Sequence, residues 1–134
     1  PSFHIGEDEM EIGIGIHGES GIRRGEKQPA NGIVDELMNN LLADFPLHAG
    51  DEVAVLINGL GATPLEELYL VYGRAYQTLK NAGINVFKTY VGEYATAMEM
   101  AGLSISLMRV DDELKQLLAH EANTPMFKQF QGED

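Results

Sequence analysis

The chain contains no cysteine, few basic residues and no long apolar run, and each absence narrows what it can be. Without cysteine, it cannot form disulfides, use a thiolate in catalysis or hold zinc through sulfur, and we expect a cytoplasmic protein. Only 9 Lys and Arg accompany 21 Asp and Glu, which gives a formal net charge of -12. Nucleic acid and anionic membrane surfaces attract clustered positive charge, so neither is an expected partner.

What is present is typical of one folded domain. The chain has 134 residues, of which 44% are hydrophobic and 22% charged. No apolar run approaches the roughly 18 residues that a membrane span needs, and no signal peptide is recognisable. The chain opens with Pro1 and not with Met, close to its first predicted strand. We therefore expect a fragment of a longer polypeptide or a processed chain.

Hydrophobic periodicity predicts strands alternating with helices. Strands are expected at about 9–17, 52–57, 84–91 and 103–110, and helices at about 33–45, 63–81 and 111–120. About eleven residues, 92–102, separate the third strand from the fourth, which leaves room for a short helix but is too few for a parallel crossover. At least one antiparallel neighbour is therefore expected. The predicted fold is α/β: a single domain with a mixed β-sheet covered by helices.

Local signals set the expected ends of these elements. Asn31 is expected to cap the first helix and Asp111 the last. Thr63 and Glu66 form a capping box with proline between them, and Gly83 ends that helix. The tail, residues 121–134, is polar and is expected to be weakly ordered.

The stretch EIGIGIHGESG, residues 11–21, sets one histidine among four glycines. In a strand, Ile12 and its alternate neighbours would face one side, while Gly13, Gly15 and His17 would share the other. Glycine weakens a strand, and one reason to find it there is close approach of a ligand. An imidazole can act as a base, a metal ligand or a nucleophile. The alternative is a structural histidine hydrogen-bonded at a strand end.

Three other features are open to functional interpretation. Backbone amides of residues 58–63 could bind phosphate, but this segment lacks the P-loop lysine and the dinucleotide spacing, so a tight strand-to-helix turn is favoured. Arg23 and Arg24 could contact a phosphoryl group, although arginines paired with acids are the favoured interpretation. Glu9 and Glu11 share the histidine's strand face but lie about 27 and 20 Å from it along an ideal strand. Neither is therefore its direct partner.

Three segments resemble, in order, the signatures of dihydroxyacetone kinases, specifically the C-terminal part of the K-type, substrate-binding subunit or domain. They are EMEIGIGIHGESG at residues 9–21, NGLGATPLEEL at 58–68, and GEY at 92–94 followed by AGLSISL at 101–107 and VDDE at 110–113. The resemblance covers nearly the whole chain, residues 1–134, as one such subdomain. Ser20 stands where the family often has proline, which leaves His17 and its glycines intact.

In that family the matching histidine attacks the carbonyl carbon of dihydroxyacetone and holds the substrate as a covalent hemiaminal. The resemblance therefore implies that His17 is the substrate anchor of a kinase. It implies that Gly15 and Gly18 bind substrate, leaving room beside the ring and bringing backbone close to the sugar. It places no metal in this chain.

The resemblance also implies partners. ATP or ADP with magnesium is held by a separate nucleotide-binding subunit or domain, and phosphoenolpyruvate can be the ultimate donor through a phosphotransferase-system protein. We expect no cofactor in this chain, and we expect it to form a homodimer.

The family's N-terminal half, which supplies a substrate loop and acid-base residues, is absent from the sequence, so the isolated chain is expected to be inactive. Two alternatives to a kinase subunit stay open. One is a regulatory paralogue that binds dihydroxyacetone and acts as a coactivator, and the other is a structural, dimerising half.

Overall fold

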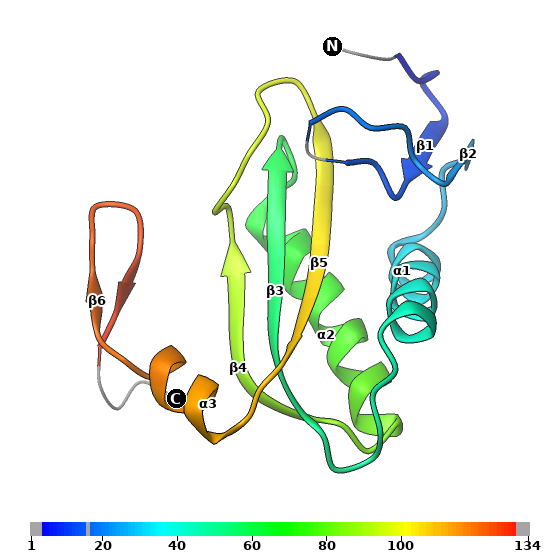
Figure 1. Cartoon of the computed structure of the whole chain (residues 1–134). Helices are drawn as coiled ribbons and strands as arrows, with labels where there is room; N and C mark the ends of the chain where they lie inside the picture. The colour runs from blue at the N-terminus through cyan, green and yellow to red at the C-terminus, as the bar shows by residue number, and fades with distance from the viewer. Residues whose placement is uncertain (1–3, 16, 131–134) are drawn as a thin grey trace.

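A mixed sheet with helices packed against it forms the body of the computed structural model, which describes residues 4–15 and 17–130 (Figure 1). The elements are β1 (Glu9–Ile12), β2 (Arg23–Glu26), α1 (Ala30–Asp44), β3 (Glu52–Gly61), α2 (Leu65–Asn81), β4 (Asn85–Gly92), β5 (Ala101–Arg109), α3 (Asp112–Leu118), β6 (Ala122–Asn123) and β7 (Lys128–Gln129). Within the described residues β4, β3 and β5 form one sheet in that order, and β1–β2 and β6–β7 are separate hairpins. The predicted α/β class is confirmed.

β3 is the centre of this sheet. It pairs parallel with β4, where Ile57 is opposite Val91, and antiparallel with β5, where Ile57 is opposite Ile105. The predicted antiparallel neighbour is therefore confirmed. The short helix expected within residues 92–102 is wrong, because this segment is a loop without helical structure between β4 and β5.

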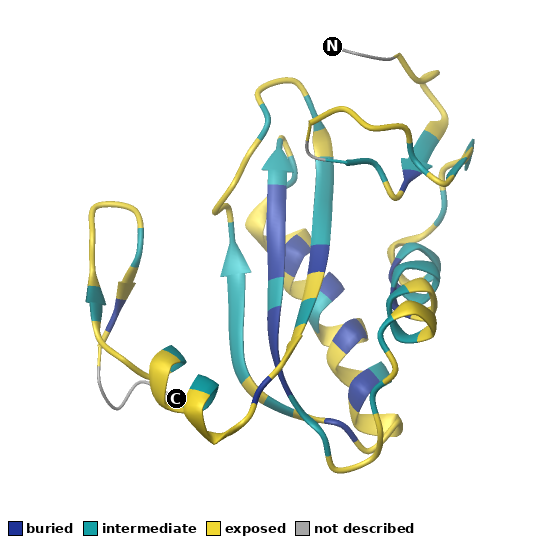
Figure 2. Cartoon of the chain, viewed as in Figure 1, coloured by how far each residue is buried: buried dark blue, intermediate teal, exposed yellow. Residues whose placement is uncertain are grey.

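The core lies between the sheet and the helices. Val53, Val55 and Ile57 of β3 are fully buried and belong to the same cluster as Val34 of α1 and Leu79 of α2. Figure 2 shows this burial as dark blue along β3 and along one side of α2, which crosses behind the sheet in this view. Successive strand residues face opposite sides, so one face of β3 supplies the core.

Local signals located some helix ends and missed others. α2 ends as predicted, and Gly83 follows it with a φ of 73°, a conformation that favours glycine. Asp111 caps α3 by accepting a hydrogen bond from the Leu114 amide. The Asn31 cap is wrong, because α1 begins at Ala30 and its N-cap position is Pro29.

The capping box at Thr63 is also wrong, because its hydroxyl donates to the Gly102 carbonyl at 2.7 Å and does not cap α2. The tail was expected to be weakly ordered. Its described part instead forms the β6–β7 hairpin, which Gln129 ties to the end of α3 by donating to the Leu118 and His120 carbonyls. Residues 131–134 lie outside the described residues.

Asn58, near the end of β3, fixes the loop between β4 and β5. Its side chain is buried, its Oδ1 accepts from the Tyr94 and Ala95 amides at 2.8 and 3.0 Å, and its Nδ2 donates to the Ala95 carbonyl at 2.8 Å. One side chain thus satisfies three backbone groups at the start of this loop.

Gly61 completes the contact with this loop. Its φ is 77°, and a Cβ added there would lie 2.2 Å from the Met100 carbonyl oxygen. Its amide donates to the Thr96 hydroxyl at 2.9 Å, and the Ala62 amide donates to the Met100 carbonyl at 2.7 Å. These amides are occupied within the chain, which supports a strand-to-helix turn over a phosphate site.

Asn58→Ala should lower the free energy of unfolding by about 2 to 4 kcal/mol, because it removes three part-buried hydrogen bonds of roughly 1 kcal/mol each. The matched control is Gln77→Ala, which removes an exposed side-chain hydrogen bond to Asn81 and should change stability by no more than about 0.5 kcal/mol. Urea unfolding followed by circular dichroism measures both. Equal, small losses in the two variants would contradict this role of Asn58.

Candidate functional site

His17 lies in the loop that joins β1 to β2, and not in a strand. The strand predicted over residues 9–17 is wrong beyond Ile12, because Gly13 has a φ of 78°, outside the range of extended backbone. The paired part runs from Glu9 opposite Glu26 to Ile12 opposite Arg23. The expectation for Ile16 falls outside the described residues. His17 therefore lies in the loop over residues 13–22 and not on a paired strand.

A tight turn places His17 at its exposed side. The Gly15 amide donates to the Glu19 carbonyl at 3.0 Å, and the Gly18 amide donates to the Gly15 carbonyl at 3.0 Å. The His17 amide donates to Glu19 Oε2 at 3.1 Å. Gly18 has a φ of 89°, which a residue with a side chain rarely adopts. The backbone amides of Gly15, His17 and Gly18 are thus all hydrogen-bonded within this turn.

Gly15 makes room for a protein side chain. A Cβ at Gly15 would lie 2.0 Å from Glu19 Oε2, so the glycine lets the glutamate fold back over the turn. This local need accounts for Gly15, and the positive φ accounts for Gly18. Their roles in substrate binding stay predictions.

Glu11, just before the loop, is hydrogen-bonded to residues near its end and just after it. Its Oε1 accepts from the Gly21 amide at 2.7 Å, and its Oε2 accepts from Arg24 Nη2 at 2.7 Å. Beside it, the Ile22 amide donates to the Ile12 carbonyl at 2.8 Å. The hydrogen bond from Arg24, helped by that from Gly21, lowers the pKa of the Glu11 carboxyl. As predicted, Glu11 is no direct partner of the histidine, but it anchors the loop that bears it.

Arg23 joins the β1–β2 hairpin to α1. Its guanidinium donates twice to the Glu36 carboxylate, each bond 2.7 Å long, and Gln28 donates to the same carboxylate at 3.1 Å. The hydrogen bonds from Arg23 lower the pKa of Glu36. The interpretation of Arg23 and Arg24 as arginines paired with acids is confirmed, and both guanidinium groups bind carboxylates of the chain.

The His17 ring is open to solvent. Within residues 4–15 and 17–130 it makes no hydrogen bond or ion pair with another side chain, and the residue is exposed. In the same part of the chain no three acidic or histidine side chains gather closely enough to hold a metal ion. An exposed imidazole on a fixed backbone can attack a small electrophile brought to it from outside.

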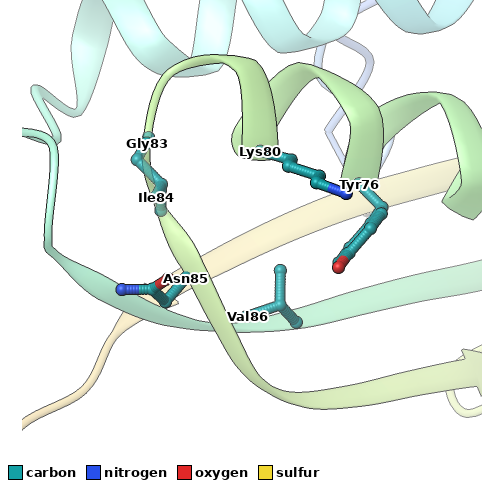
Figure 3. Close-up of a pocket in the computed structure, with 6 residues that line it drawn as sticks. All are labelled: Tyr76, Lys80, Gly83, Ile84, Asn85 and Val86. Atoms are coloured by element: carbon teal, nitrogen blue, oxygen red, sulfur yellow. The ribbon is translucent and has the colours of Figure 1, made fainter.

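A hollow in the described surface lies away from His17. A recess of about 270 Å³ lies between the end of α2 and the start of β4. Figure 3 shows the residues that line it: Tyr76, Lys80, Gly83, Ile84, Asn85 and Val86. Figure 1 places it at the opposite end of the sheet from the loop that bears the histidine. His17 is therefore not among the residues that line this recess.

None of the described helices combines the length and the apolar character required to cross a membrane.

Comparison with known proteins identifies the family. The Dak1 domain model matches residues 1–126, and the chain belongs to the Dak1 domain family. It is 49% identical over 126 residues to PTS-dependent dihydroxyacetone kinase 2, dihydroxyacetone-binding subunit DhaK, of Listeria innocua, covering 94% of this chain and 38% of that protein. It is 38% identical over 149 residues to the dihydroxyacetone-binding subunit DhaK of the PEP-dependent dihydroxyacetone kinase of Escherichia coli, covering 93% and 42%. The chain thus spans about two fifths of these relatives.

A solved structure shares the fold. The dihydroxyacetone kinase operon co-activator Dha-DhaQ superposes with a TM-score of 0.82 at 34% identity, over 94% of this chain and 39% of that one. The family resemblance found in the sequence is therefore confirmed. Kinase subunits and a co-activator both share this domain, so the fold alone does not distinguish them.

Acid should weaken the hydrogen bonds that Glu11 accepts from Gly21 and Arg24, and so lower the free energy of unfolding. Because the pKa of Glu11 lies below the unperturbed value of 4.5, its carboxylate stabilises the fold fully above that value. This contribution is lost as the pH falls through the lower, folded-state pKa. Glu11→Gln should therefore flatten the dependence of unfolding free energy on pH as the pH falls below 4.5. The control is Glu9→Gln, which alters a glutamate that accepts the Gly6 amide. Parallel pH curves for Glu11→Gln and the unmodified chain would contradict the role of this carboxylate.

Proposed function

We propose that this chain is the C-terminal part of the substrate-binding subunit of a dihydroxyacetone kinase, and that His17 binds dihydroxyacetone as a covalent hemiaminal. The observation that carries the proposal is the exposed His17 ring on a turn fixed by hydrogen bonds, in a chain of the Dak1 domain family. Relatives whose names specify dihydroxyacetone-binding subunits support the choice of substrate. The absence of cysteine fits a cytoplasmic location.

The chemistry needs a neutral imidazole. The lone pair of the unprotonated ring nitrogen forms a bond to the carbonyl carbon of dihydroxyacetone, and the carbonyl π electrons move to oxygen. That oxygen takes up a proton while the other ring nitrogen gives one up, so a neutral hemiaminal forms without an added reagent. Glycerol has no carbonyl group and cannot form this adduct, so bond formation itself selects the substrate.

The adduct would position a terminal hydroxyl of the sugar for phosphoryl transfer, in which alignment supplies much of the catalysis. In this proposal ATP or ADP with magnesium is held by a partner subunit or domain, and phosphoenolpyruvate supplies phosphate through a phosphotransferase-system protein. The PTS-dependent and PEP-dependent names of the relatives support phosphoenolpyruvate as the phosphate source in this proposal. We also propose a homodimer; the exposed apolar side chains of Ile22, Leu70 and Met98 are candidates for such an interface.

A second function has a specific observation in its favour. The co-activator Dha-DhaQ superposes closely on this chain, so a dihydroxyacetone-binding regulatory protein is the alternative to a kinase subunit. Both functions would use the His17 adduct. They differ in whether dihydroxyacetone phosphate is produced when the phosphoryl-donating partners are supplied.

His17→Ala in the complete subunit should abolish the dihydroxyacetone adduct and leave the unfolding midpoint unchanged, because the ring is exposed. Mass spectrometry after rapid trapping detects the adduct. The matched control is His48→Ala, which removes a histidine whose side chain is 81% exposed and should retain full adduct formation. An active, substrate-saturated subunit with unmodified His17 would overturn the proposal.

His17 should carry substrate and never phosphate. A phosphohistidine would need cationic groups nearby, whereas Arg23 and Arg24 bind Glu36 and Glu11. The complete subunit, incubated with its partners and labelled phosphoenolpyruvate or ATP but without dihydroxyacetone, should gain no acid-labile phosphate on His17. Adding dihydroxyacetone should release labelled sugar phosphate, and glycerol should not replace it. Stoichiometric labelling of His17 without substrate would contradict this assignment.

A further inference from the structure

We propose that Glu19 is a positioning residue for His17, an inference that rests on the proposed function. Three glutamates of the β1–β2 hairpin and its loop each accept a backbone amide hydrogen bond. Glu9 accepts from Gly6, Glu11 from Gly21 and Glu19 from His17 itself. Of these three carboxylates, that of Glu19 is the one hydrogen-bonded to the backbone amide of the proposed nucleophile, His17.

Glu19 holds the turn at two points. Its side-chain Oε2 accepts from the His17 amide at 3.1 Å, and its backbone carbonyl accepts from the Gly15 amide at 3.0 Å. The second bond joins Gly15 to Glu19 across the turn, and the first holds the backbone amide of His17. A hydrogen bond to an ionised acceptor is stronger than one to a neutral group. Glu19 therefore holds the backbone from which the histidine side chain extends.

Gly15, which has no side chain, leaves the space that the Glu19 carboxylate occupies. A Cβ at Gly15 would lie 2.0 Å from Glu19 Oε2, 2.7 Å from its Cδ and 2.8 Å from its Cβ. These distances are too short for any packed carbon, so a methyl group there must displace the glutamate. Gly15 and Glu19 consequently act as a pair, and losing either should release the His17 amide.

Such positioning matters because hemiaminal formation requires the ring nitrogen to approach the carbonyl carbon along a narrow path. Holding a nucleophile in that geometry before substrate arrives removes part of the entropic cost of the reaction. The His17 ring has no partner of its own in the described chain, so its backbone is the part that this chain can fix.

The test compares Glu19→Ala, Gly15→Ala, their double variant and Glu19→Gln in the complete subunit. Binding of dihydroxyacetone labelled with ¹³C at the carbonyl is followed by NMR, which separates the tetrahedral adduct from the free ketone. Each single alanine variant should weaken adduct formation about tenfold, the order of one charge-assisted hydrogen bond. The double variant should be no weaker than either single one, because both changes remove the same contact. Glu19→Gln keeps an oxygen acceptor and should stay within about threefold of the unmodified protein.

Glu9→Ala is the matched control and should leave adduct formation unchanged, because its amide partner is Gly6. Thermal unfolding should show the same midpoint for all variants within a few degrees, so a lost adduct would report positioning and not unfolding. Adduct formation by Glu19→Ala equal to that of the unmodified protein would overturn the proposal. A Glu19→Gln variant as weak as Glu19→Ala would also overturn it.

A second readout separates this proposal from the proposed function. Hydrogen exchange of the His17 amide, measured without substrate, should be slowed in the unmodified protein and in Glu19→Gln, and fast in Glu19→Ala and Gly15→Ala. If the unmodified protein forms no adduct while this exchange pattern holds, the hemiaminal function fails and the Glu19 contact stands. Equal exchange in all four proteins would overturn the Glu19 contact, whatever the adduct does.

Discussion

The position of β3 between two strands of opposite direction is the constraint on which the rest of the structure depends. One face of β3 buries Val53, Val55 and Ile57 against the helices, while both of its edges are hydrogen-bonded. Its last residues then hold the loop between its neighbours, through the side chain of Asn58 and the close approach at Gly61. The same strand that is buried in the core therefore also holds the loop between β4 and β5, at the end of the sheet where β3 and β4 end.

The loop that bears His17 is ordered by other means. Its residues are mostly exposed and contribute little to a core, so hydrophobic packing cannot fix it. Carboxylates do so instead. Glu11 binds the Gly21 amide near the end of the loop, and Glu19 binds the His17 amide within it. Glycines supply the positive φ values and the room that these contacts require. An exposed imidazole can in this way be held on a hydrogen-bonded backbone while its ring stays open to solvent.

Features that depend on neighbouring residues, or on the length of the segment between two strands, could be predicted from the sequence. The buried run of β3, the end of α2 at Gly83 and the antiparallel partner all follow from such signals. The loop after β4 could not be predicted, because its backbone partner, Asn58, lies 36 and 37 residues away along the chain. Alternating Ile and Gly also fitted a strand, and only the positive φ of Gly13 shows where it ends.

The candidate site divides in the same way. The residues around His17 indicated its importance, and the family match confirms the wider resemblance, but the part played by Glu19 needed coordinates. The central claim is that a backbone fixed by Glu19 presents His17 for covalent capture. A crystal structure of the complete subunit with dihydroxyacetone tests this most directly. We predict continuous density from a His17 ring nitrogen to the former carbonyl carbon, with the His17 amide still bonded to Glu19; an intact ketone bound away from His17 would contradict the account.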